Sequence, residues 1–159
     1  MLSFGQVMRV LSLVLRTDDG LKVFMRDRAN LRKVLTASEE LQDERMVGHA
    51  MRIIRLNLRD EDSVNRLFSD YPNILTYLFW ALGAFRNNES TTYDCLLSIR
   101  YATRYPHLMD TVTRETVRTV YKLENEPIAE RCRAHLDYIK AQFSARPKLR
   151  TKMLEGGID

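Results

Sequence analysis

Apolar residues recur along the chain at the three- and four-residue spacing of amphipathic helices, and no stretch shows the alternation of a strand. In the first part of the chain, the spacing predicts helices over 4–15, 21–26, 30–41 and 45–59. An acidic turn at 60–63 then restarts the cycle. Later helices are expected over 73–86, 91–104, 107–112, 114–123 and 127–143. The pattern therefore predicts an all-α protein.

The first half of the chain contains the same pattern twice. Residues 19–35 and 62–78 align at an offset of 43 residues, with Asp, Asn and Leu recurring at matched positions. The alignment continues backwards over 4–16 and 47–59, and a compressed third unit follows Pro106. A fixed period of this length is typical of stacked helical repeats, in which each unit buries its apolar face against its neighbours.

The order of short helix, long helix and long helix resembles the armadillo repeat over about residues 4–143. Where that family usually has glycine before its second helix, this chain has Ala29-Asn30 and Pro72-Asn73, and the Trp and Asn ladders of nuclear-import receptors are missing. The resemblance implies a right-handed α-solenoid of about three armadillo-like units in residues 1–143, with HEAT-like packing as the near alternative. Residues 144–159 contain proline, a basic cluster and Gly-Gly, and are expected to form a flexible basic tail.

Composition is that of an ordinary globular protein, with 45% hydrophobic residues, 29% charged residues and a net charge of +4. No apolar run approaches the ~18 residues that span a bilayer, and the N-terminal stretch lacks the basic leader and cleavage site of a signal peptide. Two distant cysteines suggest no disulfide framework and a reducing compartment. We therefore expect a cytoplasmic protein, with a nuclear location left open.

Residue types with catalytic potential form no recognised motif in this chain. The three histidines form no cluster, and there is no phosphate-binding loop or nucleotide fingerprint. Cys132 and His135 could share a helical face as metal ligands. However, Cys132 aligns with Ala50 and Cys95 in a column that favours small buried side chains. Acidic pairs at 60/62 and 124/126 are expected to cap helix starts. We therefore expect no enzyme, metal or cofactor.

Three successive third helices carry arginines at positions spaced i, i+3 and i+7, which lie on one helical face, with Ser12 and Leu97 as the exceptions, and the column fades to Ala134, Asp137 and Ala141 in the last helix. In an armadillo stack the third helices line the concave surface, so the resemblance implies a basic face that binds a partner. Alternatively, arginines near a helix C-terminus stabilise the macrodipole and solubilise the face, although this explains mid-helix Arg52 poorly. We define the arginine stripe as Arg9, Arg16, Arg52, Arg55, Arg59, Arg100 and Arg104.

The second copy of the long middle helix differs from the first along one face. Arg32, Thr36 and Glu39 in the first copy become Leu75, Phe79 and Leu82 in the second. Because the first set is polar, we expect this column to face away from the stack, where an apolar patch indicates an interface with a partner or a second copy. The alternative is that the chain covers the patch itself, through C-terminal residues Leu149, Met153 and Leu154.

Together these features favour a non-enzymatic adaptor or scaffold that binds another protein, expected to carry an acidic segment. One alternative is a regulatory helical domain that recognises an acidic peptide or a small GTPase, as similar repeats do in cytoskeletal regulators. Another is nucleic-acid binding through the arginines, for which the positive charge is low. The sequence indicates a binding module and does not name its partner.

Overall fold

The computed structural model describes residue 13 and residues 16–58 and 60–149. The described residues contain no strand, and none of their helices is long and apolar enough to cross a membrane. The all-α class expected from the sequence is thus confirmed. The helices are α2 (Asp18–Arg26), α3 (Arg28–Leu41), α4 (Glu44–Asn57), α5 (Glu61–Asp70), α6 (Ile74–Ala84), α7 (Glu89–Ala102), α8 (Pro106–Met109), α9 (Arg114–Leu123) and α10 (Glu130–Ser144).

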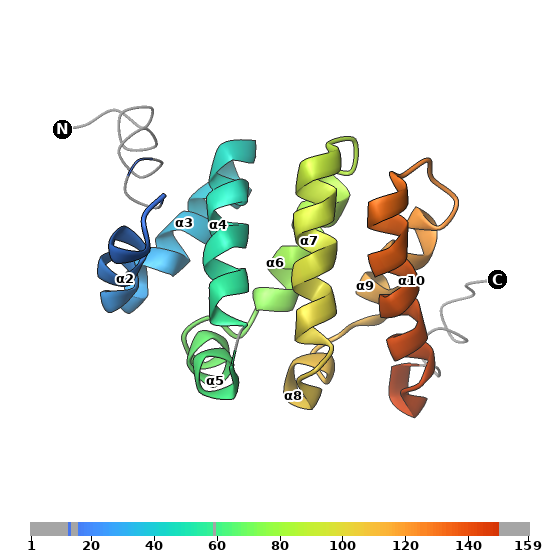
Figure 1. Cartoon of the computed structure of the whole chain (residues 1–159). Helices are drawn as coiled ribbons and strands as arrows, with labels where there is room; N and C mark the ends of the chain where they lie inside the picture. Colours follow the sequence, from blue (N-terminus) through green and yellow to red (C-terminus); the bar gives the residue numbers. More distant parts are fainter. Residues whose placement is uncertain (1–12, 14–15, 59, 150–159) are drawn as a thin grey trace.

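The longer helices form two layers. Figure 1 shows α4, α7 and α10 side by side, with α3, α6 and α9 behind them, and α4–α7 and α7–α10 are in contact. Helices α5 and α8, which follow α4 and α7 in the chain, lie near the lower ends of α4 and α7, so α4 and α7 run in the same direction. We call α4, α7 and α10 the front layer.

Short polar side chains set the starts of most helices by accepting hydrogen bonds from free backbone N–H groups. The Asp43 carboxylate accepts from Arg45 N at 2.9 Å and from Met46 N at 3.2 Å. Asp60 accepts from Ser63 N at 2.8 Å, so the capping role predicted for the 60/62 pair is confirmed for Asp60. The other capping side chains are Thr17 for α2, Asp27 for α3, Asn88 for α7 and Thr113 for α9.

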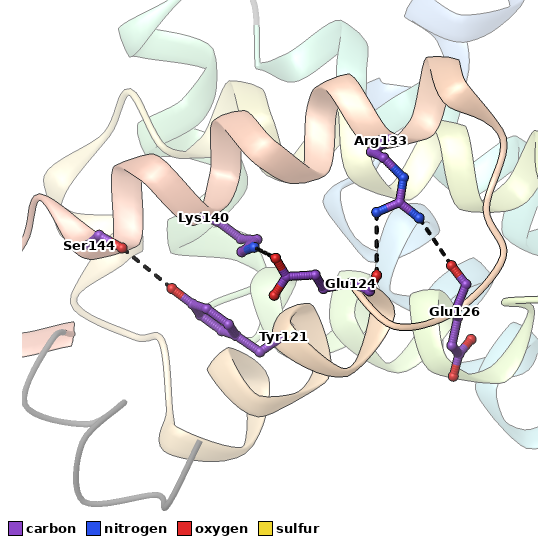
Figure 2. A network of polar contacts seen from close by, with 6 residues as sticks. All are labelled: Tyr121, Glu124, Glu126, Arg133, Lys140 and Ser144. Carbon is purple, nitrogen blue, oxygen red and sulfur yellow. Dashed lines mark hydrogen bonds and ion pairs between the residues drawn. The ribbon is translucent and has the colours of Figure 1, made fainter. Parts of the chain in front are cut away.

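The acidic pair Glu124 and Glu126 has a different role from the one predicted. Both residues follow α9, and α10 begins only at Glu130. Figure 2 shows Lys140 paired with the Glu124 carboxylate, and Arg133 donating to the backbone oxygens of Glu124 and Glu126 at 3.3 and 3.1 Å. The prediction that this pair caps a helix start is therefore wrong. The pair instead joins the end of α9 to α10.

The apolar face of α6 belongs to the core. Leu75, Phe79 and Leu82 are only 2%, 4% and 0% exposed. The ring of Phe79 lies 6.5 Å from that of Phe143 in α10, measured between centroids. The expectation that this column faces away from the stack, as a partner or dimer interface, is therefore wrong.

The position of α6 in the molecule explains why it differs from α3. Helix α6 contacts α7 and α9, so later parts of the chain cover it. In α3, by contrast, Arg32 and Thr36 stay exposed, and Arg32 Nη2 donates to the backbone oxygen of Asp70 at 2.8 Å. Burying an apolar side chain of this size is worth about 1.5–3 kcal/mol. The chain therefore gains stability by covering this face itself.

The packed part of the chain extends beyond the expected boundary at residue 143. Helix α10 continues to Ser144, Arg146 Nη2 donates to the backbone oxygen of Thr103 at 2.9 Å, and Leu149 is only 3% exposed. Residues 144–149 thus pack on the domain, so the expectation of a flexible tail from residue 144 is wrong for this segment. Met153 and Leu154 lie outside the described residues.

The small-residue column predicted for the third helices is buried. Ala50, Cys95 and Cys132 are at most 1% exposed. Burial raises the pKa of both thiols, and because the thiolate is the reactive form, this favours unreactive cysteines. The described residues contain no group of three or more His, Cys, Asp or Glu side chains that could hold a metal ion.

Candidate functional site

The stripe arginines that the structure describes on α4 and α7 lie opposite the buried sides of these helices. Helix α4 buries Val47, Ala50, Met51 and Ile54 and leaves Arg52 and Arg55 half-buried. Helix α7 likewise buries Cys95, Leu96 and Ile99 and leaves Arg100 half-buried. Since residues three and four apart share a helical face, the apolar positions that build the core also determine where the arginines point.

An open groove of about 670 Å³ lies between α4 and α7. None of the described side chains that line it is acidic. We call it the α4–α7 groove, and it is lined by Arg52, Arg55, Leu56 and Leu58 from α4 and its C-terminal end, and by Leu97, Tyr101 and Arg104 from α7 and the turn after it.

Arg55 is neutralised by a carboxylate from the neighbouring helix. Its Nη1 lies 3.1 Å from Asp94 Oδ1, and the two side chains are 31% and 28% exposed. Burial raises the pKa of the Asp94 carboxyl, and the charge of Arg55 acts against this rise. A partly exposed pair of this kind is worth about 0.2–1 kcal/mol. The main consequence of the pair is that the carboxylate of Asp94 balances most of the charge of Arg55.

Arg52 and Arg104 have no carboxylate partner among the described residues. Arg52 Nη2 makes one long contact, 3.4 Å to the backbone oxygen of Arg16. The guanidinium carbon of Arg104 lies 4.9 Å from the centroid of the Tyr101 ring, a cation–π contact. Burial lowers the pKa of His49, and the positive charges of Arg16 and Arg52 lower it further.

Arg100, in contrast, is held against α10. Its guanidinium carbon lies 4.1 Å from the centroid of the Tyr138 ring, and Nη1 lies 3.1 Å from His135 Nδ1. Because a guanidinium can only donate, Nδ1 must accept, and the neutral imidazole carries its proton on Nε2. Burial and then the charge of Arg100 lower the pKa of His135.

The same seam between α7 and α10 continues with further aromatic and cationic side chains. The Tyr93 ring meets the His135 ring edge-on at 5.2 Å between centroids. The guanidinium carbon of Arg131 lies 4.5 Å from the centroid of the Tyr93 ring, a cation–π contact. Arg131 Nε also pairs with Glu89 Oε1 at 2.8 Å. These contacts stabilise the α7–α10 seam.

The structure thus brings together only part of the arginine stripe. Arg52, Arg55 and Arg104 line one groove, whereas Arg100 lies in the next seam. Arg16 is described and exposed, and Arg9 and Arg59 lie outside the described residues.

The candidate site predicted from the sequence did not include Leu56, Tyr101, Asp94 and His135, although the repeat alignment contained a signal for the first two. Leu56 and Tyr101 occupy the same repeat position on α4 and α7, next to the arginines, and their apolar character was visible in the alignment. Asp94 and His135 gave no such signal. Each acts on an arginine of another helix, and only the packing of the helices shows which one.

Comparison of the chain with models of protein families, with curated proteins and with solved structures gives no match. The chemistry of the α4–α7 groove is therefore the basis for a functional assignment. It combines uncompensated guanidinium groups with an apolar floor. Such a surface can bind an anionic ligand that also offers apolar contacts.

Proposed function

We propose that this chain is a non-enzymatic protein-interaction module, an adaptor or scaffold, that binds an acidic segment of a partner through the α4–α7 groove. The observation that carries the proposal is the presence of Arg52 and Arg104 in that groove without carboxylate partners among the described residues. A folded chain usually pairs or disperses its charges. Two guanidinium groups beside exposed apolar carbon suit the central part of a protein interface, where arginine and aromatic residues are enriched.

The arrangement of helices supports an armadillo-like α-solenoid as the scaffold of this module. The sequence α2, α3, α4 follows the order short, long, long, and α4, α7 and α10 pack side by side. In such a stack a row of equivalent helices offers a long surface to an extended partner. The groove between α4 and α7 is then one segment of that surface.

A purely structural role accounts for some stripe arginines but not for Arg52. Arg104 follows the end of α7, where a cation stabilises the helix macrodipole. Arg52 lies in the middle of α4 and pairs with no described carboxylate. A regulatory domain that recognises an acidic peptide or the acidic surface of a small GTPase uses the same groove chemistry and is included in the proposal.

Charge reversal in the groove tests this function. We expect the double variant Arg52→Glu and Arg104→Glu to lose roughly tenfold or more in the amount of partner protein that is crosslinked and captured from a cell lysate. Arg55 is left unchanged, because reversing it would place a second carboxylate beside Asp94. The matched control is Lys33→Glu with Lys122→Glu, which makes the same change of charge at exposed positions on α3 and α9.

Circular dichroism of both variants checks that the fold is retained. The proposal predicts that the control variant captures the same proteins as the unchanged chain and that the groove variant does not. Equal capture by all three proteins would show that the groove arginines only solubilise the front layer.

A further inference from the structure

The two ends of the α4–α7 groove differ in chemistry from its middle. At one end Arg52 makes a single long contact among the described residues, and at the other the guanidinium carbon of Arg104 lies 4.9 Å from the centroid of the Tyr101 ring. A cation–π contact uses no N–H group in a hydrogen bond, so the N–H groups of Arg104 can still bind a carboxylate. Leu56 on α4 and Tyr101 on α7 follow the level of Arg52 by about one helical turn, so these half-buried side chains lie between the two arginines along the groove, and Leu97 lines the groove at the level of Arg52. The order along the groove is therefore cationic, apolar and cationic.

The spacing of the two arginines can be estimated from helix geometry. Arg52 and Leu97 occupy equivalent positions on α4 and α7, and Arg104 follows Leu97 by seven residues. Seven residues correspond to about 10 Å along a helix axis, and packed helices lie about 8–10 Å apart. The backbones at Arg52 and Arg104 are therefore roughly 14 Å apart, on a diagonal that crosses from α4 to α7.

An extended peptide of about four residues is long enough to reach from one arginine to the other. It advances about 3.4 Å per residue, so about four residues cover the diagonal. Because side chains of an extended chain alternate between two faces, residues i, i+2 and i+4 point to the same side. Acidic side chains at i and i+4 can then reach the two arginines, while residue i+2 lies over the apolar floor.

We propose that the α4–α7 groove recognises an extended segment of a partner protein with acidic side chains at i and i+4 and a large apolar side chain at i+2. This inference rests on the proposed function and specifies the partner of that same groove. One carboxylate binds Arg52, the other binds the edge of Arg104, and the apolar side chain covers Leu56, Leu97 and Tyr101. Arg55 contributes less to binding of the partner, because its guanidinium is already paired with the Asp94 carboxylate.

The apolar floor and Asp94 favour a peptide over a nucleic acid as the occupant. A nucleic-acid strand needs a continuous cationic track for its regularly spaced phosphates. Of the three groove arginines that the structure describes, two lack a carboxylate among the described residues, and the Asp94 carboxylate lies next to the third. A peptide with separated acidic side chains avoids that carboxylate and gains the apolar contact.

Three fluorescent synthetic peptides in a glycine–serine background test the pattern. The first has glutamate, leucine and glutamate at i, i+2 and i+4. The second has the same composition with the two glutamates adjacent and the leucine beyond them, and the third replaces the leucine of the first with serine. We expect fluorescence anisotropy on the full chain to show roughly tenfold tighter binding of the first peptide than of the other two.

A charge swap identifies which end of the peptide meets which arginine. The Arg104→Glu variant should bind the first peptide roughly tenfold more weakly. It should regain affinity for a peptide in which one of the two glutamates is replaced by lysine, and only one of the two such peptides should restore it. Lys33→Glu, an exposed position on α3, is the control and should bind all peptides as the unchanged chain does.

The peptide pattern and the proposed function can fail separately in these experiments. If the first two peptides bind equally, or if neither lysine peptide restores binding to Arg104→Glu, the i, i+4 pattern is wrong even when lysate capture depends on the groove. Tighter binding of a single-stranded oligonucleotide than of the first peptide, with a steep loss at higher salt, overturns a peptide occupant. If lysate capture is also independent of Arg52 and Arg104, both proposals fail.

Discussion

At the scale of single residues, the arginines of the front layer differ mainly in what each already contacts. Arg55 is paired with Asp94, and Arg100 donates to His135, whereas Arg52 makes only a long contact with a backbone oxygen in the part of the chain that the structure describes. A guanidinium that is already paired must give up that partner before it can bind another anion. The binding capacity of such a surface therefore follows from its uncompensated charges and not from the number of arginines.

The hydrogen bond between Arg100 and His135 leads to a prediction of pH dependence. In the unfolded chain the imidazole has its usual pKa of 6.5, and in the folded chain burial and Arg100 lower it. Protonation therefore favours the unfolded chain. The stabilising contribution of neutral His135 is fully present above about pH 6.5 and is lost as the pH falls through the lower folded pKa. An NMR titration of the His135 ring should show a midpoint below 6.5.

The variant His135→Gln is the control, because the glutamine oxygen accepts from Arg100 at every pH. Urea denaturation should show that the unchanged chain loses more stability than this variant between pH 7.5 and pH 5.5. Carboxylates and His49 titrate in both proteins, so their contributions cancel in the comparison. An imidazole midpoint at or above the usual value would contradict the contact between His135 and Arg100.

At the scale of secondary-structure elements, α3 and α6 show how one repeat sequence adapts to two surroundings. The core-facing residues of both helices are apolar, with Leu31 and Leu35 buried in α3 and Ile74 and Leu78 buried in α6. These positions are equivalent in the two copies. The helices differ along the next face, which later helices cover in α6 and which stays largely open in α3.

This difference predicts that substitution to alanine at one repeat position lowers stability strongly in α6 and hardly at all in α3. Phe79→Ala in α6 removes a buried ring next to Phe143 and should lower the free energy of unfolding by about 3–5 kcal/mol. Thr36→Ala in α3 is its repeat equivalent at an exposed position and should change stability by less than about 0.5 kcal/mol. Urea denaturation monitored by circular dichroism measures both. Similar midpoints for the two variants would argue that Phe79 lies outside the core.

At the scale of the whole molecule, the core is closed by the segment that follows α10. Arg146 bonds to the backbone of Thr103, at the end of α7, and Leu149 is buried in the same core as α6. A stack of helices leaves an apolar face at each end unless another part of the chain covers it. Residues 144–149 add the buried side chain of Leu149 to the core and one hydrogen bond to the end of α7.

Truncation tests this role directly. A chain that ends at residue 149 should be more stable than one that ends at residue 143 by roughly 2–4 kcal/mol, from the burial of Leu149 and the bond of Arg146. Leu149→Ala in the full chain should reproduce most of this loss. The expected readout is the urea midpoint of each protein. Equal midpoints for the two truncated chains would show that the segment adds nothing to the fold.

Local features of this molecule could be predicted well from the sequence. The helix expected over 114–123 has the same bounds in α9, and the bounds of α3, α4 and α7 lie within two residues of those predicted. The cap at Asp60 and the buried column of Ala50, Cys95 and Cys132 were also predicted correctly. These features depend on neighbours within about one helical turn, and the repeat allowed one copy to be checked against the other.

Contacts between distant residues were decided only by the tertiary structure. The packing of Phe79 on Phe143, the pairing of Arg55 with Asp94, and the bond of Arg146 to Thr103 join residues that are about 40 to 65 positions apart in the sequence. Apolar spacing shows that a helix has a hydrophobic face, but whether that face meets solvent or another helix depends on how the helices pack. For the same reason, the sequence by itself determined that α4 and α7 carry arginines, and the packing of the two helices decided which of those arginines remain available to a partner.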